Sequence, residues 1–175
     1  MISRPASPLA GPRRILGIDP GLQVTGYAVL EVRTTGPHVC EAGVIRTPRG
    51  KSTTDLAQRL RCLYDGIVEV VNLYQPTEVA VEQLFAHYDH PRTAILMGHA
   101  RGVILLAAAQ QNLPVVTFSP GRVKKTITGH GRASKLQMQH AIERELRLAR
   151  LPEPSDVADA LAIALCRYHA QRLPG

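Results

Sequence analysis

Residues 13–21 read Arg-Arg-Ile-Leu-Gly-Ile-Asp-Pro-Gly, and the interpretation of the whole chain starts from this stretch. Its apolar run predicts a buried strand that ends in the carboxylate of Asp19. Pro20 and Gly21 stop the strand at once, because Pro cannot donate to the strand ladder and Gly permits a sharp turn. The sequence therefore predicts a carboxylate at one edge of a sheet. A single Asp in this place is more typical of a turn than of catalysis, so the later acidic residues decide its meaning.

Two further strands, a helix and a fourth strand follow. Residues 25–32 and 39–46 have the β-branched and apolar content of strands, and Gly36-Pro37 between them predicts a hairpin-like pair. From Thr54 to the closing Pro76, apolar residues recur at steps of three and four, which is the helical spacing. Residues 78–82 then predict a short strand that ends, like the first, in a carboxylate, that of Glu82.

The second half alternates helices with one more strand. Residues 93–111 predict a helix that is apolar nearly all round, which is typical of a core helix or of a subunit interface. Residues 113–118 predict a buried strand, and Ser119-Pro120 begins a short helix. Ser134 and Gln137 match a capping box that opens a helix to about residue 149. Ser155 is expected to cap the last helix, 156–171.

This order of elements predicts an α/β fold with a five-stranded mixed sheet flanked by helices. Because helical crossovers join parallel strands, Asp19 and Glu82 should emerge at the same edge, where open α/β sheets place their ligands. Residues 1–12 are expected to form a flexible N-terminal extension, and residues 13–175 a single domain.

The charge of the chain predicts the kind of molecule that it binds, and its cysteine content predicts the cellular compartment. The net charge is +7, and residues 119–150 hold eight Lys and Arg against two Glu, so a nucleic acid is the expected partner. The three cysteines are scattered, which is typical of a reducing cytoplasm rather than of a disulfide framework or a zinc site. No stretch was expected to span a membrane.

Two more acidic residues begin the last predicted helix. Asp156 and Asp159 share one helix face, with Cβ atoms roughly 5–6 Å apart. Their role could be no more than a favourable electrostatic interaction with the helix dipole. Together with Asp19 and Glu82, however, they would place four carboxylates in one cavity, where like charges about 4 Å apart repel by several kcal/mol. Such a cluster takes up protons or a hard cation, so we expect two ions of Mg²⁺, with Mn²⁺ as the alternative, of the kind that cleave phosphodiesters.

The sequence resembles RuvC-type Holliday junction resolvases from about residue 14 to 170. The resemblance rests on five motifs in the same order: Gly-Ile-Asp-Pro-Gly at 17–21 with Val-Thr-Gly-Tyr at 24–27, Ala-Val-Glu-Gln-Leu-Phe at 80–85, Gly-His-Ala-Arg-Gly at 98–102, Arg-Val-Lys-Lys-Thr at 122–126, and Asp-Val-Ala-Asp-Ala-Leu-Ala-Ile-Ala at 156–164.

The resemblance implies a ribonuclease-H-like fold and a homodimeric, metal-dependent endonuclease that resolves four-way DNA junctions by paired nicks in recombination and repair. It also implies a RuvA–RuvB branch-migration complex as partner. The catalytic, metal-binding set would be Asp19, Glu82, Asp156 and Asp159. The family match gives DNA contacts to Phe85, Lys124 and Lys135, and the aromatic and basic character of their surroundings adds Tyr88, Arg92, Arg122, Lys125 and Arg132.

Other interpretations remain open for parts of this scheme. Phe85 could be a core residue, and His130 either has no role or meets a phosphate. A different ribonuclease-H-like nuclease, acting on structured RNA, would share the fold and Asp19. A sugar-kinase or actin-like ATPase needs two such domains, for which 175 residues are too few. A DNA-binding module without activity would leave the four acidic residues without purpose.

Overall fold

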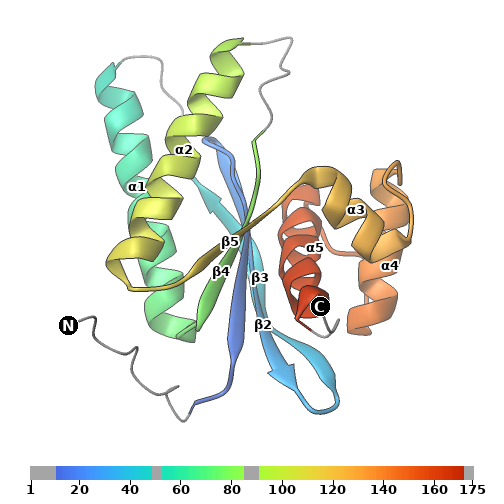
Figure 1. The fold of residues 1–175 in the computed structure, drawn as a ribbon. Coiled ribbons are helices and arrows are strands. Elements are labelled where there is room, and N and C mark those ends of the chain that lie inside the picture. Colours follow the sequence, from blue (N-terminus) through green and yellow to red (C-terminus); the bar gives the residue numbers. More distant parts are fainter. Residues whose placement is uncertain (1–10, 49–52, 85–90, 172–175) are drawn as a thin grey trace, which may run out of the picture.

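The computed structural model describes residues 11–48, 53–84 and 91–171, which form one sheet with helices on both faces (Figure 1). The strands are β1 (Arg14–Asp19), β2 (Val24–Arg33), β3 (Gly36–Arg46), β4 (Glu78–Glu82) and β5 (Val115–Phe118). The helices are α1 (Thr53–Tyr74), α2 (Pro91–Gln110), α3 (Pro120–Thr128), α4 (Lys135–Leu146) and α5 (Ser155–Ala170).

The predicted five-stranded mixed sheet is confirmed, with the strand order β3-β2-β1-β4-β5. β1, β2 and β3 pair antiparallel, whereas β4 and β5 run parallel to β1. Ile18 lies opposite Val81, so the next residues, Asp19 and Glu82, end neighbouring strands at the same edge of the sheet. We call this edge the acidic edge.

The hairpin between β2 and β3 differs from the prediction at its turn. Gly36 and Pro37 belong to β3, where they pair with Arg33 and Val32, and the two-residue turn is Thr34-Thr35. Gly36 has a φ of 124°, which a side chain would strain. Gly36 thus correctly predicts a turn nearby, but it lies just beyond the turn itself.

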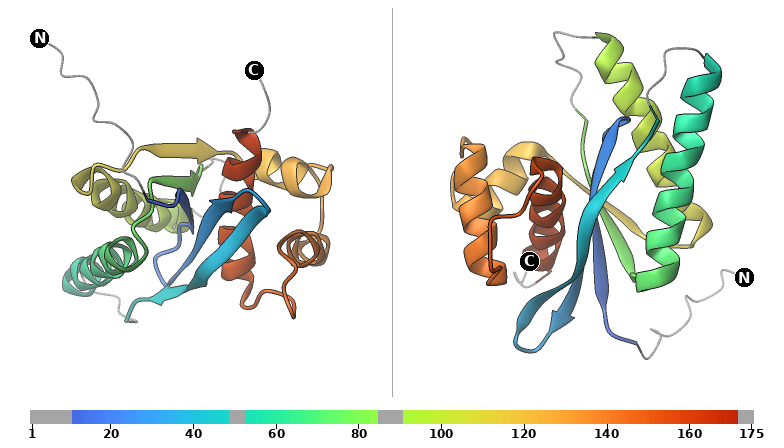
Figure 2. Two further views of the ribbon diagram at one scale, coloured as in Figure 1. Left: turned by 90° about the horizontal axis from the view of Figure 1, so that it is seen from below. Right: turned by 180° about the vertical axis from the view of Figure 1, so that it is seen from behind.

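Alternating side chains divide the interior into two layers. Ile15, Ala28 and Ala80 face α3, α4 and α5, whereas Leu16 and Ile18 face α1 and α2. Figure 2 shows the two helix layers on opposite faces of the sheet. Asp19 and Glu82, in step with Ile15 and Ala80, therefore point to the α5 side.

α2 departs from the expectation that it would be buried on more than one side. Ala100, Ile104 and Ala107 pack in the core, but Ile95 and Leu106 are 61% and 53% exposed. By length and composition alone, 92–110 is also apolar enough to cross a membrane, contrary to our expectation, although only 22% of it is buried. Core helices of soluble proteins meet the same criterion, so its free apolar face is the informative feature.

The helix ends follow the sequence signals with two exceptions. Ser119 caps α3, Gly129 ends it, and the capping box of Ser134 opens α4 as predicted. α4 ends earlier than expected, because Arg147 takes a left-handed conformation with a φ of 52°. Ser155 does not cap α5: Pro154 occupies the cap position, where its fixed φ suits an extended residue and no side chain caps the helix.

Candidate active site

Two strands and one helix bring the four predicted acidic residues together. Asp19 and Glu82 end β1 and β4, and Asp156 and Asp159 lie in the first two turns of α5, which packs across β1 and β2. The negative charges of Glu82, Asp156 and Asp159 all act on Asp19. We call these four residues the acidic cluster.

Two glycines let α5 approach the sheet closely enough to bring Asp156 and Asp159 next to Asp19. A Cβ atom on Gly26, the strand partner of Asp19, would lie 2.0 Å from the backbone oxygen of Asp156. A Cβ atom on Gly17 would lie 2.4 Å from the backbone oxygen of Ala160. Real Cβ atoms do not approach backbone so closely, so glycine is required at both positions.

The turn after Asp19 is held by a buried threonine. The hydroxyl of Thr25 donates to the carbonyl oxygen of Gly21 at 2.5 Å and accepts from the backbone N–H of the same residue at 3.4 Å. Thr25 is fully buried. This contact fixes the chain between β1 and β2, and with it the position of the Asp19 carboxylate.

Burial and mutual repulsion disfavour negative charge in the acidic cluster. Burial, together with the charges of the other three acidic residues, raises the pKa of Asp19 from 3.8 to about 8, although Lys135 opposes the rise. Burial, with the charge of Asp159, raises the pKa of Glu82 to about 7. Burial and Asp156 also raise the pKa of Asp159, although Lys135 and Lys124 oppose this shift. At neutral pH the cluster therefore holds protons or attracts cations.

The four carboxylate groups lack partners within the described residues. None of them takes part in a salt bridge or a hydrogen bond there. All four residues are half-buried and not fully enclosed. The cluster is thus accessible to a ligand.

The donor set has the chemistry of a site for a hard divalent cation. It consists of carboxylate oxygens alone, which are the ligands that Mg²⁺ and Mn²⁺ prefer. As the side chains stand, however, no three His, Cys, Asp or Glu residues of the described segments converge tightly enough to hold a metal ion. The residue types fit such an ion, although their present arrangement does not close around one.

Basic residues of α3 and α4 lie beside the cluster. Lys124 acts on Glu82 and Asp159, and Lys135 acts on Asp19 and Asp159. The structure therefore brings these two predicted DNA contacts to the acidic residues. Such positive charges offset part of the repulsion between the carboxylates.

The other predicted DNA contacts are spread more widely. Arg122 stacks over the ring of Phe118 at 5.1 Å, and Lys125, Arg132 and Arg92 are exposed. Phe85 and Tyr88 lie outside the described residues, so their contacts with DNA stay predictions.

Sequence reasoning gave no role at the site to Arg101 of α2. Its Nε donates to the carbonyl oxygen of Glu82 at 3.3 Å, and its Nη2 donates to the hydroxyl of Thr117 at 3.3 Å. Arg101 thereby ties the ends of β4 and β5 to α2. Only its place between Gly98 and Gly102 in a family-like motif could have signalled this.

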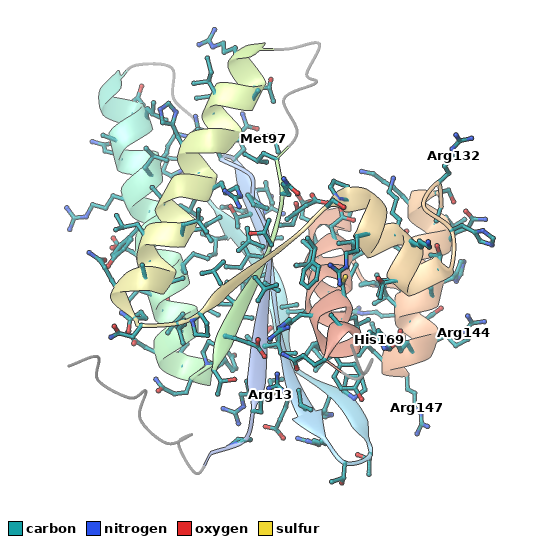
Figure 3. All side chains as sticks on the ribbon, in the orientation of Figure 1. Arg13, Met97, Arg132, Arg144, Arg147 and His169 are labelled. Carbon is teal, nitrogen blue, oxygen red and sulfur yellow. The ribbon has the colours of Figure 1, made fainter. Side chains whose placement is uncertain are left out.

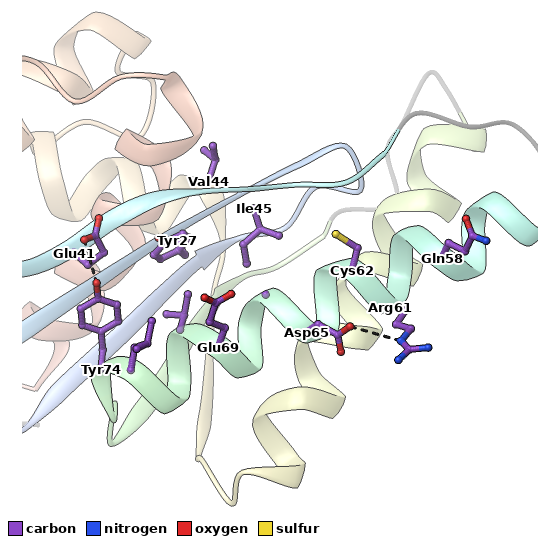
Figure 4. A pocket seen from close by; sticks show the side chains of 13 residues that line it. Tyr27, Glu41, Val44, Ile45, Gln58, Arg61, Cys62, Asp65, Glu69 and Tyr74 are labelled. Atoms are coloured by element: carbon purple, nitrogen blue, oxygen red, sulfur yellow. Dashed lines mark hydrogen bonds and ion pairs between the residues drawn. The ribbon is translucent and has the colours of Figure 1, made fainter.

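A cavity of about 740 Å³ lies on the opposite face of the sheet, between α1 and the β2–β3 hairpin (Figure 4). Its walls carry Glu41, Asp65 and Glu69, and the Tyr74 hydroxyl donates to Glu41 at 3.1 Å. Arg61 also lines the cavity and pairs with Asp65 at 3.6 Å, so its acidic residues outnumber its basic ones, and none of the acidic cluster lines this cavity. It is therefore separate from the candidate active site.

A mixed sheet with clustered carboxylates at its strand ends, and basic helices beside them, defines a nuclease of the ribonuclease-H-like class. A family model described as crossover junction endodeoxyribonuclease RuvC matches residues 15–167. The chain belongs to this family.

Individual relatives agree with this assignment. The chain is 53% identical over 162 residues to a crossover junction endodeoxyribonuclease RuvC from Rhodopirellula baltica, a match covering 91% of this chain and 88% of the relative. A relative of the same description from Pelotomaculum thermopropionicum is 43% identical over 155 residues, covering 89% and 92%.

Solved structures confirm the ribonuclease-H-like fold. The structure of Thermus thermophilus RuvC in complex with Holliday junction substrate matches with a TM-score of 0.83 and 32% identity, covering 91% of this chain and 95% of that one. The yeast mitochondrial Holliday junction resolvase Ydc2, at 14% identity and a TM-score of 0.62, shares the fold.

Proposed function

We propose that this protein resolves four-way DNA junctions by paired, symmetric nicks, with the acidic cluster as its catalytic centre. The observation that carries the proposal is the convergence of Asp19, Glu82, Asp156 and Asp159 at the acidic edge, where their carboxylates have no salt bridge or hydrogen bond to any other described residue. Family membership, and the similarity to a RuvC bound to junction DNA, support the choice of substrate.

The proposed cofactor is a pair of Mg²⁺ ions, with Mn²⁺ as the alternative, held by the four carboxylates. When bound, two such ions activate a water molecule and stabilise the leaving oxygen of a phosphodiester. The protein itself contributes the fixed spacing of its ligands: Gly17 and Gly26 set the distance of α5 from β1, and Thr25 fixes the turn after Asp19.

The basic residues of α3 and α4 hold the DNA backbone over this centre. Lys124 and Lys135 lie within electrostatic reach of the carboxylates, so they can bind the phosphates that flank the scissile bond. Arg122, Lys125 and Arg132 extend the positive surface. We assign Phe85, Tyr88 and Arg92 to DNA binding from the sequence and from family membership.

A homodimer would pair two such centres for two nicks, and the free face of α2 is its proposed interface. Ile95 and Leu106 lie three helical turns apart on this face, together with Gly98 and Gly102. A Cβ atom on either glycine would meet nothing within 4 Å, so neither glycine is needed inside the protomer. Glycine costs a helix about 1 kcal/mol relative to alanine, and here it leaves room for a second helix to approach.

The proposed partner protein rests on family membership, and the proposed cellular compartment rests on the cysteines. We propose a RuvA–RuvB branch-migration complex as partner on family membership alone. A cytoplasmic location suits three free cysteines, of which Cys166 is buried and Cys40 and Cys62 are partly exposed.

The test of this function is Asp19→Asn. The variant keeps the shape of the side chain but removes a charge that divalent ions need. We expect it to lose Mg²⁺-dependent cleavage of a four-way junction by at least about 100-fold while binding the junction with unchanged affinity.

The assay compares a four-way junction, a linear duplex and a structured RNA, each with Mg²⁺ and with EDTA. Preferential cleavage of the RNA by the wild type would favour the alternative nuclease. Full activity of Asp19→Asn would remove the acidic cluster from catalysis.

A further inference from the structure

Arg101 of α2 holds the last peptide group of β4, the one that joins Glu82 to Gln83. The Nε atom of Arg101 donates to the carbonyl oxygen of this group at 3.3 Å. The N–H of the same group, which belongs to Gln83, donates to the carbonyl oxygen of Phe118 in β5 at 2.8 Å. Because a peptide group is planar, these two contacts fix the backbone from which the side chain of Glu82 projects.

The same guanidinium group is also bound to the neighbouring strand. The Nη2 atom of Arg101 donates to the hydroxyl of Thr117 at 3.3 Å, and Thr117 lies opposite Val81 in the pairing of β5 with β4. A guanidinium group presents its N–H donors in a rigid fork, so one arginine can hold two acceptors at a fixed relative position. Arg101 therefore fastens the ends of β4 and β5 to each other and to α2.

Arg101 acts from the face of the sheet that lies opposite the carboxylates. α2 packs with α1 on one face, whereas α5, which carries Asp156 and Asp159, packs on the other (Figure 2). The side chain of Glu82 points to the α5 side, in step with Ala80. Arg101 thus reaches the backbone of Glu82 rather than its carboxylate, so it can position this group without neutralising it.

The end of β4 depends on this contact more than the end of β1 does. The pairing of β4 with β1 stops at Val81 and Ile18, one residue before Glu82. On its other side β4 pairs with β5, which is a short strand at the edge of the sheet. β1, which ends in Asp19, is central and pairs on both sides. Without Arg101, the last peptide group of β4 would keep only its bond to the edge strand among the contacts of the described residues.

We infer that Arg101 is a positioning residue for Glu82: it fixes the end of β4 so that this carboxylate can share a cation with the rest of the acidic cluster. The inference rests on the proposed function of that cluster, and it gives α2 a part in the site. Contacts that hold a metal ligand in place affect metal affinity strongly, and their loss typically weakens binding by roughly 10- to 100-fold.

A guanidinium group close to a nuclease site could instead bind a phosphate of the DNA. Two of the three nitrogen atoms of Arg101 already donate to protein acceptors. Lys124 and Lys135, the basic residues beside the acidic cluster, lie in helices on the other face of the sheet. Both observations favour the positioning role, and the experiment separates the two roles.

The experiment measures the binding of Mn²⁺ to the full-length protein without DNA, by the electron paramagnetic resonance signal of the free ion. Arg101→Ala should raise the dissociation constant for Mn²⁺ by at least about tenfold. Its affinity for a four-way junction in EDTA, and the salt dependence of that affinity, should stay unchanged. Arg101→Lys keeps the charge and one donor but lacks the fork, so it should recover part of the Mn²⁺ affinity.

Thr117→Val tests the same contact from its other end. Valine has nearly the shape of threonine and suits a strand, and this change leaves the charge of Arg101 in place. The variant should bind Mn²⁺ about threefold more weakly than the wild type. It should have no further effect in an Arg101→Ala protein, because both changes then remove one shared contact.

Arg14→Ala is the matched control, because Arg14 also ties a strand to a helix. Its Nη1 atom donates to the carbonyl oxygen of Tyr74, the last residue of α1, at 2.8 Å. Figure 3 shows its neighbour Arg13 at the end of the sheet opposite Met97, which lies one turn before Arg101 on α2. Arg14→Ala should lower the melting temperature and leave the Mn²⁺ affinity unchanged.

The possible outcomes decide between the roles. A folded Arg101→Ala protein with the Mn²⁺ affinity of the wild type, or additive effects of the changes at Arg101 and Thr117, would overturn the inference. Weaker junction binding in EDTA with a smaller salt slope would also overturn it, and would make Arg101 a phosphate contact. If Arg101→Ala does not fold, Arg101→Lys and Thr117→Val provide the same test.

The proposed function fails by a different result, which is full cleavage of the junction by Asp19→Asn. The acidic cluster would then not be the catalytic centre, whereas its Mn²⁺ affinity would still report whether Arg101 positions Glu82.

Discussion

Glu78 and Glu82 stand at the two ends of β4 with their side chains on the same face of the sheet, in opposite electrostatic surroundings. Burial would raise the pKa of Glu78, but hydrogen bonds from Gln171, Arg167 and Arg13 outweigh it and lower the pKa. Glu82 has no such donors within the described residues, and its pKa rises to about 7. Hydrogen-bond donors thus stabilise the negative charge of Glu78, whereas the carboxylate of Glu82 at the acidic edge is left free for a ligand.

The unneutralised charges should cost stability in the metal-free protein. The pKa of Asp19 is about 8 in the folded chain, against an ordinary pKa of 3.8 for this side chain. The folded state therefore holds the proton more tightly, and the penalty for ionising Asp19 grows from about pH 4 and is complete above about pH 8. We expect Asp19→Asn to raise the melting temperature in EDTA by about 5 °C or more above pH 8, with a smaller difference at pH 5.

Thermal melts across this pH range, with and without Mg²⁺, check the expectation. Mg²⁺ should raise the melting temperature of the wild type more than that of the variant, because ligand binding to the folded state stabilises it. A variant less stable than the wild type at pH 8 in EDTA would contradict the assigned repulsion.

The position of α5 depends on how closely it approaches β1 and β2. Gly26→Ala would drive a methyl group into the backbone oxygen of Asp156, from which its Cβ would lie only 2.0 Å away. Because backbone cannot turn aside as a side chain can, the start of α5 should shift outward and carry Asp156 and Asp159 with it. We expect cleavage to fall by at least about 10-fold, and the Mg²⁺ concentration for half-maximal rate to rise, with junction affinity little changed.

Gly66→Ala supplies the matched control for this change. The atoms nearest to its Cβ would all belong to the side chain of Ile45, the closest at 2.9 Å, so this side chain would have to shift, but Gly66 lies on α1, on the other face of the sheet from α5. Alanine also favours a helix over glycine by about 1 kcal/mol. This variant should cleave normally, and a Gly26→Ala protein with an unchanged Mg²⁺ requirement would show that α5 does not position the carboxylates.

The elements that sequence predicted well are those whose signals are local. The starts of α3 and α4 could be predicted from Ser119 with Pro120 and from Ser134 with Gln137, because a helix cap depends on residues within four positions of one another. The four acidic residues could be chosen from strand ends and helix spacing. Their convergence could not be measured in this way, because the contacts of Gly17 and Gly26 with α5 join residues more than 100 positions apart. The hydrogen bonds of Arg101 to Glu82 and Thr117 span only 19 and 16 positions, and their sole signal was the place of Arg101 in a family-like motif.

At the scale of the whole molecule, the basic region and the apolar face of α2 lie on opposite sides of the sheet, although Leu136 of α4 is also 56% exposed. The basic residues of 119–150 gather on the α3–α4 side of the sheet, whereas the exposed apolar residues of α2 lie on the other side (Figure 2). A dimer formed through α2 would therefore leave both basic surfaces free. The periodicity of 93–111 could not distinguish core from interface, since both require apolar residues. The exposure of Ile95 and Leu106 on one stripe is the observation on which the proposed interface rests.

Leu106→Glu tests this arrangement. Leu106 is 53% exposed on the proposed interface, so its replacement by a charge should leave the protomer folded but bury two unpaired carboxylates in a dimer. We expect sedimentation to show a monomer at micromolar concentration, and junctions to be nicked once instead of twice in the lifetime of a complex. Leu73→Glu, at a leucine of α1 that is 66% exposed, should remain dimeric and make paired nicks. A dimeric Leu106→Glu protein would move the interface away from α2, whereas a monomer that still makes paired nicks would separate coupled cleavage from dimer formation.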